Sequence, residues 1–382
     1  MIQESVKRLL DRVNNEENHT CEFPPSIYMA PSVQRDLSPS SFNPQLVSIG
    51  PLHREDENVK AFEGQKASYL IYLMSLINSP QEEILESCMQ KAYSVMNEIK
   101  ECYIWTKPFS DAEIAEMMVL DACFILGFII DEHFSFHEKA YMGKELQYLL
   151  NSHKLFGADL KFNNISFRTN DHLLSLLHQC FMPPDNYAKK VKRTNIIHSA
   201  IDLDRAGVNF KPSKDPTWVM GMEVKQNRFP WFFWSWNRPT LTMSVLRVSD
   251  STELLFRNLI AYEQSFQTQC YVSSYAFVLD MLVNSQDDVA KLVESKVLVN
   301  IMGSNEEAAN MINNICKKVI VSNSYYEEEL EKLIKYCNRS WPKHIAKMRS
   351  TYFSSPWSII ALVAGIILFV LQVLQTAFTI KS

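Results

Sequence analysis

Ionisable side chains that could do chemistry are few in this sequence, and Asp121 is the first of them. It lies inside the apolar run 117–130, where loss of water would raise the pKa of a carboxyl group and suit it to carry a proton. A carboxylate in such a helix more often accepts hydrogen bonds from backbone groups or from a neighbouring helix. The sequence leaves both roles open for Asp121.

His133 and His137 form the second candidate site, in the stretch "DEHFSFHEK". Two histidines four residues apart lie one helical turn apart, and they could hold zinc if a third ligand came from elsewhere in the chain. The surrounding residues are polar and follow the apolar run directly. We therefore expect a polar loop at this point and no structural metal.

Motifs that bind phosphate or activate a nucleophile are missing from the sequence. Its nine glycines form neither a G-x-G-x-x-G pattern nor a Walker loop, and there is no G-x-S-x-G or H-E-x-x-H motif. The net charge of −5 argues against a nucleic-acid partner. We expect a non-enzymatic protein without a cofactor; the alternative is a membrane-tethered enzyme that uses Asp121 or the His133/His137 pair.

Glu63 and Lys66 have the i, i+3 spacing of an ion pair on a helix. Such a pair on a solvated face stabilises a helix by a few tenths of a kcal/mol. We expect this pair to be exposed and to have no chemical role.

The stretch "FPWFFWSW" (229–236) has six aromatic residues among eight. Such residues suit a strand pair packed against helices, and an exposed set of them would form a binding or membrane-contact surface. Both interpretations stay open. The residues of this candidate interaction surface are Phe229, Trp231, Phe232, Phe233, Trp234 and Trp236.

The C-terminal run 357–380 has 24 residues and no charge. A helix of this length measures roughly 36 Å, enough to cross a hydrocarbon core of about 30 Å. Ala361 and Gly365, small residues four positions apart, would let a second helix approach, so a weak homodimer is possible as a corollary. Gln372 and Gln375 could hydrogen-bond to another span. The residues that define this expected membrane-spanning helix are Trp357, Ala361, Gly365, Gln372, Gln375 and Ile380.

The charges around this run predict its orientation. Six basic residues lie between 332 and 349, whereas Lys381 alone follows the run. By the positive-inside rule the body of the protein would lie in the cytosol, attached to the bilayer by a tail anchor. The N-terminus is charged and lacks the apolar stretch of a signal peptide.

Periodicity predicts a mainly α fold, with a helical body, a small antiparallel β insertion and one C-terminal transmembrane helix. The expected parts are an amphipathic segment at 1–20, a globular domain at 21–351 with its β element at about 206–248, and the helix at 356–380. Helix starts are marked by four capping-box patterns: Ser79/Glu82, Ser110/Glu113, Ser285/Asp288 and Ser304/Glu307.

Several segments in a fixed order resemble one family, the plant proteins grouped as domain of unknown function 247, also called uncharacterised protein family 0481. The resemblance covers about 340 residues. Its segments are "LVSIGPLH" (46–53), "FEGQK" (62–66), "EMMVLDACFIL" (116–126), "HSAIDLDRAGVNFKPS" (198–213), "RNLIAYEQ" (257–264), "DVAKLVESKVLVNIMGSNEEAANMINNICKKV" (288–319) and "YFSSPWSIIALVAGIILFVLQVLQTAF" (352–378).

The resemblance implies a plant protein with a C-terminal membrane helix, often at the plasma membrane, and no established enzyme activity. Some grass members are implicated as male determinants of self-incompatibility, which implies recognition or signalling with a protein partner. Two departures stand out. The family's Leu-Glu-Asn-Gln-x-Pro segment has no counterpart between Asp131 and Leu177, and its Ile-Pro stretch is replaced by the aromatic run at 229–236.

Overall fold

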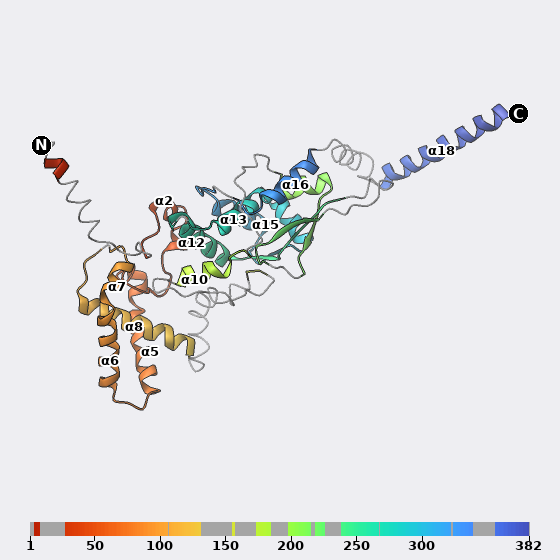
Figure 1. Cartoon of the computed structure of the whole chain (residues 1–382). Coiled ribbons are helices and arrows are strands. Elements are labelled where there is room, and N and C mark those ends of the chain that lie inside the picture. The colour runs from red at the N-terminus through yellow and green to blue at the C-terminus, as the bar shows by residue number, and fades with distance from the viewer. Residues whose placement is uncertain are drawn as a thin grey trace. The chain divides into compact units, whose positions relative to one another are not determined.

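The fold is that of a computed structural model of the chain (Figure 1). The structure describes residues 4–7, 27–105, 107–130, 155–156, 173–184, 198–214, 218–225, 238–266, 268–321, 324–338 and 356–381. His133, His137, the aromatic run 229–236 and most of the segment 1–20 lie outside the described residues, so the expectations for them stay predictions.

The chain divides into two compact units. Unit 1 comprises Met1–Leu150 and Lys161–Cys180, and unit 2 comprises Asn151–Leu160 and Phe181–Ser382. Each unit has buried apolar residues of its own, as a folding unit requires.

Unit 1 is helical in its described part. Helices α5 and α6 both pack on α8, the long apolar helix, and all three are seen together in Figure 1. Ile114, Ala115 and Val119 of α8 form one buried cluster with two residues of α6 and α7. The helices are α2 (Ser32–Arg35), α3 (Pro39–Phe42), α4 (Glu57–Lys60), α5 (Glu63–Ser75), α6 (Gln81–Ser94), α7 (Met96–Cys102), α8 (Asp111–Ile130) and α10 (Leu173–Cys180).

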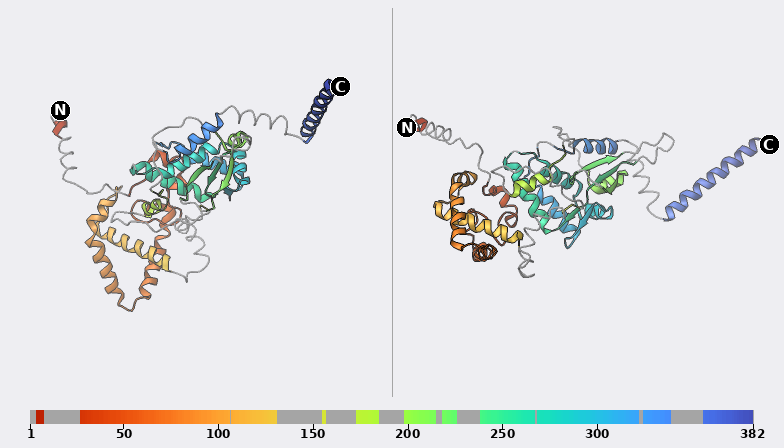
Figure 2. Two further views of the ribbon diagram at one scale, coloured as in Figure 1. Left: turned by 45° about the vertical axis from the view of Figure 1, so that its right-hand side comes forward. Right: turned by 60° about the horizontal axis from the view of Figure 1, so that its bottom comes forward.

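Unit 2 is built around α13, which buries ten of its twelve residues. Helices α12 and α15 both contact it, and the strands lie beside these helices in the two views of Figure 2. The helices are α11 (Ala200–Ala206), α12 (Asp250–Phe266), α13 (Tyr271–Leu282), α14 (Gln286–Glu294), α15 (Asn305–Ile315), α16 (Glu327–Cys337) and α18 (Pro356–Lys381).

The strands correct the expectation of a small antiparallel insertion. β3 (Thr240–Met243) lies between β1 (Asn209–Pro212), with which it runs parallel, and β2 (Met222–Lys225), with which it runs antiparallel. A second, parallel pair joins β4 (Leu246–Val248) to β5 (Leu298–Asn300), a strand outside the expected range. Alternation along a strand predicts which side chains are buried but not which strand lies next to it.

Three of the four predicted helix starts are confirmed. Ser285 and Asp288 form a complete capping box, Glu113 accepts from the Ser110 N–H, and the Glu307 N–H donates to Ser304. The prediction at Ser79 is wrong, because α6 begins at Gln81 with Pro80 as its extended N-cap residue. Ser79 therefore lies one residue too early to cap it.

Helix α18 is the last element, and its described side chains are all exposed. They include Leu368 and Phe369, which expose 66% and 68% of their surface. Among the residues that the structure describes, no helix has the length and apolar character that a bilayer span needs.

A buried carboxylate joins α12 to α13. Glu263 of α12 is fully buried, and its two oxygens accept the N–H groups of Val272 and Ser273 at 2.8 and 2.7 Å and the Ser273 hydroxyl at 2.5 Å. These N–H groups belong to the first turn of α13, where backbone donors lack partners inside the helix and the helix dipole favours a negative charge. Glu263 thus supplies the capping group that Cys270, at the N-cap position, does not.

We expect Glu263→Ala to lower the free energy of unfolding by about 3 kcal/mol, because two buried N–H groups and a hydroxyl would lose a charged acceptor. Hydrogen exchange of the full chain, measured by mass spectrometry, should show faster exchange at the start of α13. Glu294→Gln, at a carboxylate that is 72% exposed, is the control. Unchanged exchange in α13 after Glu263→Ala would contradict this role.

Candidate functional site

A group of buried charges in the described part of unit 1 surrounds Lys66 of α5, whose side chain is fully buried. Its ammonium donates to the Ser48 carbonyl oxygen and to Asp121 Oδ1, both at 2.5 Å. Glu63 Oε1 lies 2.7 Å from the same nitrogen. One cation thus binds a loop, its own helix and helix α8.

Asp121 of α8 binds both Lys66 and the loop that contains Gly50. Its second oxygen, Oδ2, accepts the Gly50 N–H at 2.6 Å, so both carboxylate oxygens have partners. Gly50 has φ +78°, and a Cβ at that position would lie 2.7 Å from the Tyr103 hydroxyl oxygen. Only glycine suits both this backbone conformation and this close contact.

The environment shifts the acidities of two groups here. Burial raises the pKa of the Asp121 carboxyl above its ordinary value, against the opposing effects of the Lys66 ammonium and the Gly50 N–H. Burial, followed by the charge of Asp121, raises the pKa of Tyr103 to about 12. Tyr103 therefore stays neutral at physiological pH.

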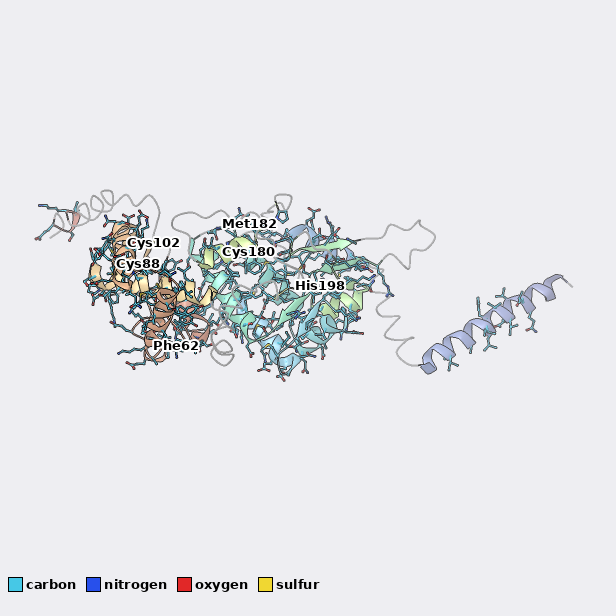
Figure 3. The ribbon with its side chains drawn as sticks, turned by 90° about the horizontal axis from the view of Figure 1, so that it is seen from below. Phe62, Cys88, Cys102, Cys180, Met182 and His198 are labelled. Atoms are coloured by element: carbon cyan, nitrogen blue, oxygen red, sulfur yellow. The ribbon has the colours of Figure 1, made fainter. Side chains whose placement is uncertain are left out.

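The expectation that Glu63 and Lys66 form a solvated pair is wrong. Lys66 lies on the buried face of α5, four residues after Phe62 and three before Tyr69, which pack together with Phe124 of α8. Figure 3 labels Phe62 at this place in unit 1. Phe62, Lys66 and Tyr69 are spaced so that they lie on one face of a helix. This spacing, rather than the distance from Glu63 to Lys66 in the sequence, indicates a lysine within an apolar stripe.

The sequence left Asp121 as either a proton carrier or a structural hydrogen-bond acceptor, and the geometry favours the acceptor. With one oxygen held by Lys66 and the other by Gly50, the carboxylate acts as a hydrogen-bond acceptor that joins elements. A general base needs an oxygen within reach of a substrate proton. In the described part of the chain, no group of three His, Cys, Asp or Glu side chains is arranged to hold a metal ion.

Asp288 makes a comparable junction in unit 2. Its Oδ1 accepts the Ile201 N–H at 2.9 Å, and its Oδ2 accepts the N–H groups of Asn284 and Ser285 at 3.2 and 3.0 Å. The carboxylate thereby caps α14 and fixes the first turn of α11. Burial would raise its pKa, but the hydrogen bonds from Ile201, Ser199, Ser285 and Asn284 together hold the pKa of Asp288 below its ordinary value.

A hollow opens in unit 2 between β2, β3, α11, α13 and α16. Its free volume is about 20 Å³, which is room for about one water molecule. Its walls are mainly apolar, and their residues are His198, Leu203, Met222, Leu241, Val278, Met281, Leu282, Tyr326, Glu329, Leu330, Leu333 and Ile334.

These features define a mainly helical protein with small mixed sheets, whose buried acids join one element to another. The chain belongs to the plant family known as domain of unknown function 247, described as "plant protein of unknown function". The family's sequence model matches residues 27–165 and 138–371. The resemblance expected from the sequence is thus confirmed.

Two curated relatives come from Arabidopsis thaliana. UPF0481 protein At3g47200 is 22% identical over 426 residues, covering 93% of this chain and 86% of that protein. The putative UPF0481 protein At3g02645 is 28% identical over 181 residues, covering 47% of this chain and 32% of that protein. No solved structure matches the chain.

Three segments that carry the family resemblance meet at Lys66. The segment 46–53 supplies Ser48 and Gly50, the segment 62–66 supplies Lys66 itself, and the segment 116–126 supplies Asp121. Segments that are separate in the sequence thus share one set of hydrogen bonds.

We expect Lys66→Met and Asp121→Leu each to destabilise unit 1 by about 3–5 kcal/mol, because each leaves an unpaired charge in the interior. The double variant Lys66→Met/Asp121→Leu should cost less than the two single changes added together. Hydrogen exchange of the full chain at residues 46–54 and in α8 provides the measurement.

Lys100→Met is the control for these variants, since the Lys100–Asp111 pair of 2.6 Å has side chains that are 40% and 54% exposed. Its effect should stay within about 1 kcal/mol. Additive effects of Lys66→Met and Asp121→Leu would show that the two charges do not stabilise each other.

The low pKa of Asp288 predicts a pH dependence. A carboxyl whose pKa is lower in the folded than in the unfolded chain, where it is about 3.9, contributes stability above that value. The contribution is lost as pH falls through the folded pKa. Asp288→Asn should therefore reduce stability at neutral pH and weaken its decline in acid, as urea unfolding at several pH values would measure.

Asp287→Asn, at the exposed neighbouring position, is the control and should leave the acid limb unchanged. An acid limb that is equally steep in wild type and Asp288→Asn would exclude Asp288 as the titrating group.

Proposed function

We propose that this protein is a non-enzymatic, membrane-anchored recognition or signalling protein, held on a bilayer by α18. The observation that carries the proposal is the run 357–380, which has 24 residues and no charge. The large apolar side chains among its described residues are exposed, from Leu374 at 48% to Phe369 at 68%. Apolar surface of this extent favours transfer from water by about 25 cal/mol per Å².

The membrane would be the plasma membrane of a plant cell, and the body of the protein would lie on its cytosolic side. Six basic residues at 332–349 precede α18, and by the positive-inside rule an excess of basic residues marks the cytosolic side of a span. Ala361 and Gly365 would allow a second α18 to approach, and Gln372 and Gln375 offer polar groups for the same contact.

Absence of enzyme activity is part of the proposal. Asp121 would need a free oxygen and access to substrate, and both of its oxygens already accept hydrogen bonds in a buried site. A recognition protein instead needs a surface that binds its partner. The sequence offers the aromatic run at 229–236 as the candidate for this surface. Its partner would be a protein, in line with the roles implied by relatives.

The anchor can be tested by ending the chain at Ser355. Full-length protein expressed in plant cells should remain in the membrane pellet after carbonate extraction, whereas the shortened chain should move to the soluble fraction. Protease added outside sealed cells should leave the body intact. Solubility of the full chain in carbonate, or glycosylation of Asn164, would overturn the anchor or its orientation.

The recognition role needs its own experiment. Proximity labelling from the full chain should identify a protein whose labelling falls when Trp231, Phe233 and Trp236 are replaced by serine. Replacement of exposed Ile71 and Leu76, elsewhere on the body, is the control. A labelling profile that the aromatic changes leave unaltered would remove this run as the recognition surface.

A further inference from the structure

Three Ser-Pro pairs occur in the sequence, at 38–39, 79–80 and 355–356, and there is no Thr-Pro pair. A serine followed by proline is the minimal substrate pattern of the proline-directed class of protein kinases. Because proline has no N–H group, a kinase groove without a hydrogen-bond acceptor at that position favours proline over other residues. The structure describes two of the three serines, Ser38 and Ser79, and it places them in different environments.

Ser79 lies in the loop between α5 and α6, which joins the two helices at their lower ends in Figure 1. Every residue from 75 to 83 is exposed, which covers four positions on each side of the serine. A kinase binds a short extended segment of its substrate on both sides of the hydroxyl group. The whole segment around Ser79 is therefore accessible to such an enzyme.

The Ser79 hydroxyl makes no hydrogen bond to any residue that the structure describes. Pro80, with extended backbone angles, takes the N-cap position of α6, so the serine does not cap this helix. The Ile77 N–H still donates to the Met74 carbonyl oxygen, and the next such bond of the described chain runs from the Ile84 N–H to Pro80. Neither helix holds Ser79, and its hydroxyl is available for reaction.

Ser38 has the same following proline but a different environment. It exposes only 8% of its surface, and its Oγ lies 2.8 Å from the Ser41 Oγ. Pro39 begins helix α3, so the chain after Ser38 is helical rather than extended. A kinase would have to unfold this turn to reach the hydroxyl. The fold thus distinguishes two serines that the sequence pattern makes equivalent.

We propose that Ser79 is a phosphorylation site for a proline-directed serine kinase. The Ser79 Oγ attacks the γ-phosphorus of ATP and forms a new O–P bond, while the bond from that phosphorus to the β–γ bridging oxygen breaks. ADP leaves, and the hydroxyl proton passes to the catalytic aspartate of the kinase. Glu82, three residues after the serine, disfavours kinases that require a basic residue there and leaves the mitogen-activated class.

The modification would change the charge at one end of the α5–α6 pair. A phosphate adds about −1.5 to −2 charges at neutral pH. It would lie just before α6, a helix without a side-chain cap, whose dipole favours a negative charge at that end. Leu76 and Ile77, which expose 56% and 50% of their surface, lie directly before it. Phosphorylation would thus place a strong charge beside an exposed apolar stretch.

The test uses purified full-length protein in lipid nanodiscs, an activated mitogen-activated protein kinase and magnesium ATP, with peptide mass spectrometry to locate the phosphate. Ser79 should become phosphorylated, whereas Ser38 should stay unmodified. As the synthetic peptides 33–44 and 74–85, both serines should accept phosphate, because the fold no longer protects Ser38. Equal modification of the two serines in the folded chain would overturn the selection by exposure. Absence of phosphate from Ser79, in the chain or in its peptide, would overturn the site.

Two variants separate the hydroxyl from the proline. Ser79→Ala should abolish phosphorylation of the loop, and Pro80→Ala should lose most of it although the hydroxyl remains. Ser75→Ala is the matched control, since Ser75 is an exposed serine four residues earlier that no proline follows, and it should leave phosphorylation of Ser79 unchanged. Phosphorylation of Pro80→Ala at the rate of the unaltered chain would exclude a proline-directed kinase.

A second arm examines plant cells that express the full chain. Activation of the mitogen-activated cascade should raise the phosphorylated fraction of Ser79, and an unchanged fraction would overturn the site as one that the cell uses. This arm rests on the cytosolic orientation proposed above, whose failure shows separately as glycosylation of Asn164. The experiment with purified protein does not depend on that orientation.

Discussion

The buried ammonium of Lys66 is the constraint on which the described part of unit 1 depends. A charge removed from water needs compensating partners, and Lys66 has them in Ser48, Asp121 and Glu63. Because these partners come from a loop, from α8 and from α5, the charge is stable only when the three elements come together. Gly50 then lets the loop approach Asp121 closely enough to donate its N–H.

In unit 2 buried charged groups also join separate elements, and there they are carboxylates that bind the N–H groups at the starts of helices. Glu263 accepts donors from the first turn of α13, and Asp288 accepts the N–H groups of Ile201 in α11 and of Ser285, the N-cap residue of α14. Each acid satisfies N–H groups that a helix leaves without partners at its beginning. Buried acids in this protein therefore hold elements together, which accounts for ionisable residues in apolar helices without requiring catalysis.

The residues of these junctions lie in segments that carry the resemblance to the family. Ser48, Lys66, Asp121, Glu263 and Asp288 each lie in one of the segments by which the chain resembles its relatives. A buried donor and its acceptor depend on each other, since removal of either one leaves the other without a partner.

The sequence by itself determined the mainly helical class, the family, the alternating burial of the strands and the capping of α14 by Ser285 and Asp288. These features depend on local spacing, which the order of residues contains. Only the tertiary structure decided that β1 runs parallel to β3, that β5 joins β4, and that Lys66 is buried against Asp121. The hollow beside His198 also belongs to this group. Each of these depends on residues far apart in the chain, whose meeting is set by the packing of whole elements and the need to compensate buried charge.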